Sequence, residues 1–453
     1  MKKRSFLEAN MLSGSIVKNL VIFALPLMFT NLLQSLYNMA DMIVLGRFAG
    51  KEAFAAVGAT GSTYNLIINI FLGVATGAGV LVAQQMGARD TERLNKTIHT
   101  SAAVSLILGV VVGAIGLAFS PFILKAIDTP EDIFDGAVLY LRIMFLGIPA
   151  QIAAAFGGAI LRSAGDSRHP MYYLSAAGVL NVILNIFFVL GFNMKVEGVA
   201  LATIISQYLS AFLMWRHLYK TGECYYFSIK ETKIHKQELW DMVKIGIPSG
   251  LQMSMFSISN LIIQSAINSF GTDYVAANTT SGNVENLCLI TLSSLTQAIM
   301  IFAGQNFGAK NIKRLKELLL KGMALTCVWA LFFGFVCTLL GRPLMHIYTS
   351  EEHIIEIGMQ RLSIICPLYF LCGLYESALG LVRGMGYSLT PMIAAVLGIC
   401  AFRIVYIYFI FPVFKSYTSL LFTYPISWFI TFLFMLALFV IYYNRHKKLI
   451  EST

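Results

Sequence analysis

The sequence has few charged residues. Asp, Glu, Lys and Arg make up 12% of its 453 residues, whereas hydrophobic residues make up 57%. An average soluble protein carries roughly twice that share of charge. A water-soluble chain of this length needs a charged surface that so few residues cannot cover, so the composition predicts an integral membrane protein. It also excludes a collagen, a coiled coil, a disordered tail and a disulfide scaffold.

Several signals of bound cofactors or catalysis are also missing. The chain has no Gly-x4-Gly-Lys-Ser/Thr phosphate loop and no nucleophile-triad pattern, so we expect neither ATP binding nor an enzyme. The seven cysteines form no CxxC pair or Cys/His cluster, and we expect no cofactor. The seven histidines lie near span ends or in loops and indicate no metal site.

Long apolar runs dominate the chain. A helix crosses the hydrocarbon core with about 20 mostly apolar residues. Twelve runs meet that length, at about 17–45, 60–85, 97–125, 133–161, 170–192, 197–219, 242–269, 277–305, 317–345, 355–381, 389–414 and 417–443. The fold class predicted from these runs is an all-α integral membrane protein with twelve transmembrane helices.

The loops between these spans differ in charge. Most of the 33 lysines and arginines fall in alternate loops, whereas acidic clusters at 128–135 and 351–356 fall in the others. By the positive-inside rule, the basic loops and both termini are cytoplasmic, in a multi-pass protein of the plasma (inner) membrane. Topology accounts for the net charge of +10, so we expect the lipid bilayer, and no nucleic acid, as a partner.

The chain contains an internal repeat. Ala83–Arg89 matches Gly304–Lys310 at an offset of 221, and Arg162-x-x-Gly-x4-Pro matches the same motif at Arg383. Six spans separate the paired motifs, an even number, so the repeats are parallel. We therefore predict an N-lobe of spans one to six at 1–219, a cytoplasmic linker at 220–239 and a C-lobe of spans seven to twelve at 240–453.

Three acidic residues lie well inside the predicted spans: Asp41, Glu285 and Glu376. Each costs roughly 2.5–3.5 kcal/mol at the centre of a membrane helix, which marks it as a candidate site residue. Asp41 ends a polar stripe on span one that includes Gln34 and Asn38. For Glu285 and Glu376, the alternative is an ion pair with one of two arginines inside spans, Arg361 or Arg403.

Further polar or helix-bending residues lie on other spans. Asn181 and Asn185 form an i, i+4 pair on span five, and Thr203 lies near the start of span six; hydrogen bonds between helices are the alternative role for these groups. Span seven carries Asn260 and Gln264 but no acid. Pro26 and Pro248 lie within spans one and seven, where a proline produces either a static kink or a hinge.

The doubled Gly-Ala-Arg/Lys turn, the doubled Arg-x-x-Gly-x4-Pro motif and Asn38-x-x-Asp41 resemble the MATE (multidrug and toxic compound extrusion) family. The resemblance covers essentially the whole chain and is closest to the DinF-like and MepA-like prokaryotic branch. It implies a secondary active antiporter with two lobes. Such a protein exports amphipathic or cationic drugs in exchange for H+ or Na+ by alternating access.

The resemblance also implies roles for residues. Asp41, Asn181, Asn185 and Thr203 match the family's N-lobe coupling-ion site, except that the family usually has Asp where Asn185 stands. Asp41, Asn181 and Thr203 could still hold Na+, or Asp41 could act as a single protonatable carboxyl. We expect cavity-lining residues at Gln34 and Asn38 in the N-lobe and at Glu285, Glu376, Asn260 and Gln264 in the C-lobe. We expect hinges at Pro26 and Pro248.

Other functions remain open from the sequence. A lipid-linked oligosaccharide flippase of the same superfamily is the first alternative, and a receptor or channel that transports nothing is the second. The flippase usually calls for more spans or for a lumen rich in Arg and Lys, whereas only Arg142, Arg361 and Arg403 lie well inside the spans here, away from their ends. We expect the transporter to be a monomer.

Overall fold

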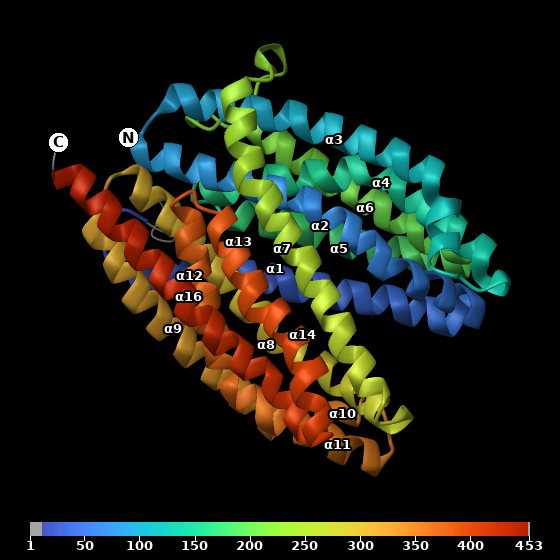
Figure 1. Ribbon diagram of the computed structural model, residues 1–453. Coiled ribbons are helices and arrows are strands. Elements are labelled where there is room, and N and C mark those ends of the chain that lie inside the picture. Colours follow the sequence, from blue (N-terminus) through green and yellow to red (C-terminus); the bar gives the residue numbers. More distant parts are fainter. Residues whose placement is uncertain (1–10, 452–453) are drawn as a thin grey trace. The chain divides into compact units, whose positions relative to one another are not determined.

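A computed structural model describes residues 11–451, apart from the side chains of Lys51, Ser62, Ile450 and Glu451. The described residues form helices and connecting turns, with no β-strand among them (Figure 1). Lys2, Lys3 and Arg4, which contribute to the prediction of a cytoplasmic N-terminus, lie outside the described residues.

The chain divides into two compact units. We call Phe29–Gly250 the N-unit, and Met1–Met28 together with Leu251–Thr453 the C-unit. The chain passes from one unit to the other within α1 and again within α7. The elements from α1 to α7 are α1 (Ile16–Val44), π-turn η1 (Leu45–Ala49), α2 (Lys51–Ala88), α3 (Thr91–Ala126), α4 (Glu131–Ser163), α5 (Arg168–Ile186), π-turn η2 (Phe187–Gly191), α6 (Val196–Lys220), 3-10 turn η3 (Ile229–Glu231) and α7 (Lys236–Asn268).

The C-unit contains the remaining helices. They are α8 (Thr272–Gly308), α9 (Ile312–Leu339), α10 (Gly341–Met345), α11 (Glu352–Ile365), 3-10 turn η4 (Cys366–Leu368), α12 (Tyr369–Gly384), α13 (Leu389–Ala395), π-turn η5 (Val396–Ala401), α14 (Phe402–Val405), π-turn η6 (Tyr406–Ile410), α15 (Phe411–Phe414) and α16 (Tyr417–Glu451). α9 with α10, α11 with α12, and α13 to α15 each make up one expected span.

The predicted fold class is confirmed. Within the described residues, eleven helices are long and apolar enough to cross a membrane. The remaining expected span is α7, whose 33 residues correspond to about 50 Å of helix. α7 does not reach the same hydropathy because polar side chains interrupt it, among them Ser249, Gln252, Ser254, Ser257 and Asn260.

The two halves use the same turn chemistry at equivalent positions. Arg89 and Lys310, 221 residues apart, both adopt a left-handed backbone conformation, with φ of 57° and 55°. The next residue in each case is the N-cap of a helix: Asp90 accepts a hydrogen bond from Arg93 N, and Asn311 accepts one from Arg314 N. A left-handed residue ends one helix and a capping side chain starts the next, so the repeat appears in backbone geometry as well as in sequence.

Small residues allow neighbouring helices to approach closely within each unit. A Cβ added at Gly109 of α3 would lie 2.5 Å from Cα of Pro149 on α4, and one at Gly384 of α12 would lie 2.4 Å from the carbonyl oxygen of Met300 on α8. Larger residues there would force the helices apart, which is the packing that small-residue motifs serve in membranes.

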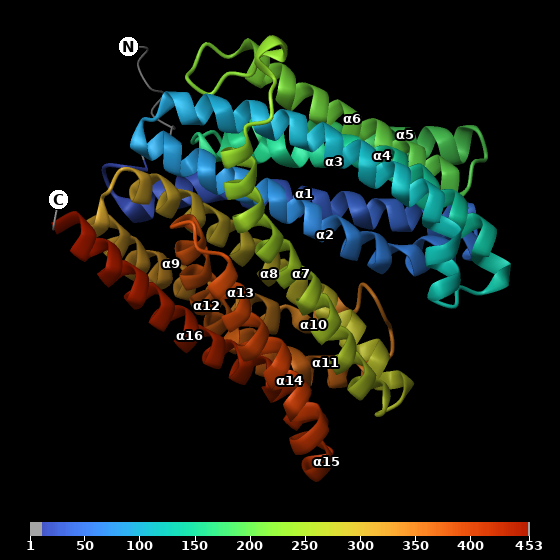
Figure 2. The same cartoon turned by 45° about the horizontal axis from the view of Figure 1, so that its top comes forward.

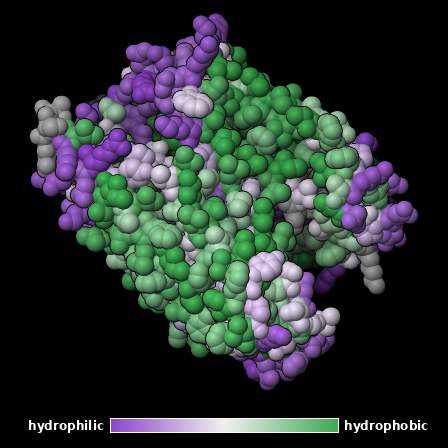
Figure 3. All heavy atoms as spheres, viewed as in Figure 1, coloured by the Kyte–Doolittle hydropathy of each residue, from purple (hydrophilic) through white to green (hydrophobic). Residues whose placement is uncertain are grey.

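The surface is apolar between the helix ends. Large hydrophobic side chains such as Leu106, Phe122 and Phe409 are 63–74% exposed. Figure 3 shows hydrophilic residues gathered over the α6–α7 loop and the α3–α4 turn of the N-unit, and around α11 in the C-unit. An apolar surface with polar helix ends suits lipid contact better than water.

The polar stretch between α6 and α7 packs against the N-unit (Figure 2). Ser228 N donates to His99 Nε2 of α3 at 3.0 Å, and His235 N donates to Thr100 Oγ1 at 3.1 Å. Phe227 packs on a buried cluster that includes Leu94 of α3. The predicted linker is therefore a docked segment of one unit.

Candidate functional site

Four predicted site residues converge inside the N-unit from three helices. Asn185 Nδ2 of α5 donates to Asp41 Oδ1 of α1 and, at 3.3 Å, to Asn181 Oδ1 one turn away. Asn181 Nδ2 donates to Thr203 Oγ1 of α6 at 3.4 Å, and Thr203 Oγ1 donates to the Val199 carbonyl at 2.9 Å. One continuous hydrogen-bonded chain therefore joins α1, α5 and α6.

The acid in this group is not neutralised by a base. No Lys, Arg or His among the described residues forms an ion pair with Asp41, whose hydrogen-bond partner is the Asn185 amide. Asn185 is fully buried, and its Oδ1 has no hydrogen-bond partner in the part of the chain that the structure describes. A carboxylate and an amide carbonyl oxygen are ligand types that suit a small hard cation, although here the amide nitrogen of Asn185 faces the carboxylate.

The backbone changes beside this site. α1 becomes the π-turn η1 four residues after Asp41, and α5 becomes the π-turn η2 two residues after Asn185. The two π-turns pack against each other. Single π-turns inside α-helices are frequent at functional sites, because the extra residue re-aims side chains.

The two predicted cavity residues of the N-lobe lie outside this hydrogen-bonded group. Gln34 and Asn38 are exposed and make no side-chain hydrogen bond with any described residue, so the structure does not join them to the Asp41 group. Tyr140 of α4 interacts electrostatically with Asp41. Sequence reasoning missed Tyr140 because no spacing rule links α4 to α1.

In the C-unit, Glu285 of α8 is ion-paired. Arg361 of α11 reaches it with two nitrogens, Nε at 3.0 Å and Nη2 at 2.7 Å, both to Oε2. The Tyr369 hydroxyl donates to Oε1 at 2.7 Å, and Arg361 Nη1 donates to Asn278 Oδ1 at 2.5 Å. Glu285 is therefore neutralised and held from both sides, in contrast to Asp41.

Two more predicted C-lobe residues join this network. Gln264 accepts a hydrogen bond from Asn278 at 2.9 Å, which links it to Arg361. Asn260 accepts one from Arg403 Nη1 at 3.1 Å. Both guanidinium groups also contact the Tyr424 ring, whose centroid lies 5.1 Å from Arg361 Cζ and 4.5 Å from Arg403 Cζ.

Glu376 of α12 lies apart from that network. It accepts hydrogen bonds from Thr296 at 3.0 Å and from Tyr375 at 3.4 Å. Arg383 acts on it electrostatically but donates to Gln252 at 2.7 Å. No base forms an ion pair with Glu376 within the described ranges.

The two prolines lie where the chain passes between units. Pro26 is inside α1 and Pro248 is inside α7. The boundary between the units falls two residues after each of them. A proline frees a backbone carbonyl and weakens the helix locally.

Comparison with known proteins places this geometry in a family. The MatE family model matches residues 26–187 and again residues 248–409, so the two matches begin at the two prolines. The chain belongs to the MATE family. The members of this family are transporters and not enzymes. Its family and its many apolar helices together show that the chain is a multi-pass membrane protein.

Curated MATE relatives cover most of the chain. It is 27% identical over 392 residues to "Probable multidrug resistance protein YoeA" of Bacillus subtilis, with 85% of each chain covered. It is 23% identical over 383 residues to "Multidrug export protein MepA" of Staphylococcus aureus, with 84% of each covered.

Solved transporter structures share the fold. A structure described as the "Outward-facing conformation of a multidrug resistance MATE family transporter of the MOP superfamily" matches with a TM-score of 0.89 at 22% identity, covering 97% of this chain and 99% of that one. A MOP superfamily transporter from Pyrococcus furiosus matches with a TM-score of 0.88 at 21% identity, covering 97% and 98%.

Proposed function

We propose that this MATE protein is a secondary antiporter that exports amphipathic, cationic small molecules in exchange for H+ or Na+. Multidrug export is supported by two of its curated relatives, which are named as a probable multidrug resistance protein and a multidrug export protein. The observation that supports ion coupling is the Asp41 group: an acid at membrane depth that accepts a hydrogen bond from an amide and has no base as an ion-pair partner among the described residues. An intramembrane acid without a counter-charge is a functional group by default.

Competition for Asp41 would couple the two fluxes. With the carboxylate charged and no cation bound, the Asn185 amide donates to it. When a proton or Na+ binds the Asp41 carboxylate, it replaces the hydrogen bond that the Asn185 amide donates to that group. Half a turn of the Asn185 amide then directs its unpartnered Oδ1 inward, where it acts as a cation ligand. Because Asp41 lies on α1 and Asn185 on α5, the free and the ion-bound states of Asp41 would favour different packing of these two helices.

The choice of ion depends on charge. Na+ prefers carboxylate oxygens, and this site offers one carboxylate where the family usually has two. Asn181, Asn185 and Thr203 supply neutral oxygens only. We therefore propose H+ as the coupling ion, with Asp41 as the group that carries it and Na+ as a weaker ligand.

Alternating access would use the two passages between units. Pro26 and Pro248 are the proposed hinges, because the chain leaves one unit and enters the other two residues after each. The lobes predicted from the sequence, 1–219 and 240–453 with a linker at 220–239, remain the proposed repeats, and the two compact units are the proposed moving bodies. The lobes differ from the compact units in three ways: the first lobe takes the whole of α1, residues 220–239 form a separate linker, and the second lobe takes α7 from residue 240 onward.

A cytoplasmic location of both termini is also part of the proposal. In the N-unit, one buried cluster joins the end of α2, the start of α3 and the ends of α4 and α6. These are the helix ends that carry the basic loops. In the C-unit, Arg314 at the start of α9 donates to the carbonyls of Met11, Ser13 and Gly14, which lie before α1. We further propose a monomer in the plasma (inner) membrane that uses neither ATP nor a nucleic acid.

Ethidium export from cells that express the protein tests this function. Cells are loaded with dye, and export is followed with the proton gradient collapsed by an uncoupler, or with the Na+ gradient removed. We expect export to stop with the uncoupler and to continue without Na+. Export that survives the loss of both gradients would contradict ion coupling altogether.

A lipid-linked oligosaccharide flippase is the second candidate, because of Arg403. Arg403 is 5% exposed, its guanidinium donates hydrogen bonds to Ser427 and Asn260, and no described carboxylate forms an ion pair with it. A buried cation without a counter-charge would attract a lipid pyrophosphate. Arg403→Gln tests this: a flippase loses lipid translocation, whereas a drug antiporter keeps ethidium export.

A further inference from the structure

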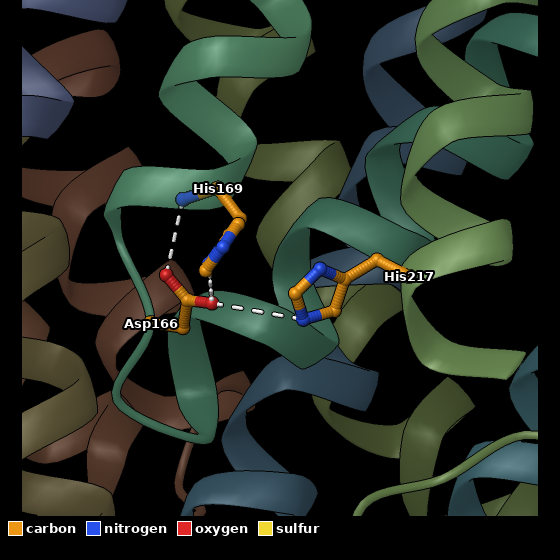
Figure 4. Close-up of side chains that lie close together, drawn as sticks. All are labelled: Asp166, His169 and His217. Carbon is orange, nitrogen blue, oxygen red and sulfur yellow. Dashed lines mark hydrogen bonds and ion pairs between the residues drawn. The ribbon is translucent and has the colours of Figure 1, made fainter. Parts of the chain in front are cut away.

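Three side chains with metal-ligating atoms meet where α4 ends, α5 begins and α6 ends. Asp166 lies in the turn after α4, His169 in the first turn of α5, and His217 in the last turn of α6. One ligand atom from each lies within 4.8 Å of the others. Figure 4 shows both imidazole rings beside the Asp166 carboxylate.

We propose that Asp166, His169 and His217 form a binding site for a divalent transition-metal ion of the zinc class, with water as the fourth ligand. Zn2+ takes imidazole nitrogen and carboxylate oxygen at about 2.0–2.2 Å, so ligand atoms around a tetrahedral ion lie roughly 3.3 Å apart. Asp166 Oδ2 lies 2.5 Å from His169 Nδ1 and 4.0 Å from His217 Nε2, which brackets that value.

The ligands are oriented by neighbouring groups. The Tyr173 hydroxyl lies 2.9 Å from His217 Nδ1, which leaves His217 Nε2 to face Asp166. The backbone N–H groups of Arg168 and His169 donate to Asp166 Oδ1 at 3.1 and 3.0 Å, which leaves Oδ2 for the imidazoles. Hydrogen bonds of this kind fix the ligand atom and raise metal affinity.

The site is open to solvent ions. The side chain of His169 is 48% exposed, and those of Asp166 and His217 are 18% and 19% exposed. Apart from the two proposed histidine ligands, no base among the described residues forms an ion pair with Asp166, so no lysine or arginine competes with a metal ion for its carboxylate.

The second half of the chain shows that the turn forms without these ligands. Gly165 and Gly386 both have positive φ, 104° and 92°, and lie 221 residues apart. At the same offset, Tyr387 replaces Asp166 and Thr390 replaces His169. Because the turn keeps its glycine and loses its ligands in the C-unit, the backbone does not need Asp166 or His169 in order to fold this way.

A bound ion would join the start of α5 to the end of α6. These helices carry Asn181, Asn185 and Thr203 of the Asp41 group, so the ion would hold two sides of that group together from the far end of the helices. The metal site does not depend on the proposed antiport, and its test measures metal binding alone.

The test uses the full-length protein in detergent, purified with a histidine-free tag and stripped with a chelator. Bound Zn2+ is measured by mass spectrometry after equilibrium dialysis. We expect one Zn2+ per chain, lost in His217→Ala and in His169→Ala. Tyr173→Phe should weaken binding by roughly 10–100-fold, because it removes the partner of the ligating ring.

Two control variants should bind as the unmodified protein does. Cys224→Ser removes the exposed thiol of the α6–α7 loop, and His446→Ala removes the C-unit histidine that pairs with Tyr387. The visible d–d spectrum of the Co2+-loaded unmodified protein needs no variant: four-coordinate N/O ligation gives an intense band. No such band, or Zn2+ binding that survives both His169→Ala and His217→Ala, would overturn the proposal.

Discussion

The Glu285–Arg361 pair gives a prediction with a calculable size. Glu285→Gln keeps the shape of the side chain, and its amide can still bond Arg361 and Tyr369. The change therefore removes the charge and little else, leaving a buried guanidinium whose remaining polar partners are neutral. Breaking a buried pair on one side costs roughly 3–5 kcal/mol.

This loss should be visible in thermal unfolding. For a unit of this size, each kcal/mol shifts Tm by about 2–4 °C, so we expect a fall of roughly 6–20 °C. The assay heats detergent-solubilised protein and measures the fraction that remains monodisperse on gel filtration. Adding Arg361→Gln to Glu285→Gln removes both charges, so the double variant should be more stable than the single variant.

An exposed pair in the same unit provides the matched control. Arg342 Nη1 lies 3.2 Å from Glu352 Oε2, and both side chains are more than half exposed. Glu352→Gln should cost at most about 1 kcal/mol. If Glu285→Gln unfolds at the same temperature as Glu352→Gln, then Glu285 does not stabilise the C-unit, and its role as a substrate ligand regains weight.

The remaining predictions concern ion choice and topology. Asn185→Asp restores a second carboxylate beside Asp41 and should make dye export in inverted vesicles respond to a Na+ gradient at fixed pH; an unchanged response would mean that the four residues do not form one site. Cys224 should react with a membrane-impermeant maleimide only after cells are opened, whereas Glu352→Cys should react in intact cells. Partial burial raises the pKa of the Cys224 thiol, so its labelling should be faster in mildly alkaline buffer.

Local sequence patterns predicted the helices well. Hydropathy alone located the spans, because a membrane helix must be apolar over its whole length. α7 was the hardest case, since its serines and amides lower its hydropathy although its length suffices. The offset repeat also appeared in the sequence, and the paired left-handed turns at Arg89 and Lys310 account for its Gly-Ala-Arg and Gly-Ala-Lys motifs.

Contacts between distant helices were harder to predict. The sequence left Arg361 and Arg403 as equal partners for Glu285, and only packing distinguishes them. The proposed metal site shows the same limit: 48 residues separate His169 from His217, so no local spacing links the two histidines. Asp166 and His169, three residues apart at the start of α5, were the one local signal.

The central claim is that Asp41 couples ion entry to substrate export, and its removal is the most direct test. Asp41→Asn keeps a polar side chain of the same size that can still bond Asn185. We expect normal expression and a monodisperse protein, with gradient-driven ethidium export abolished. Asp135→Asn, an exposed acid of α4, should export normally. If Asp41→Asn exports at the rate of the unmodified protein, Asp41 is structural and the proposed coupling is wrong.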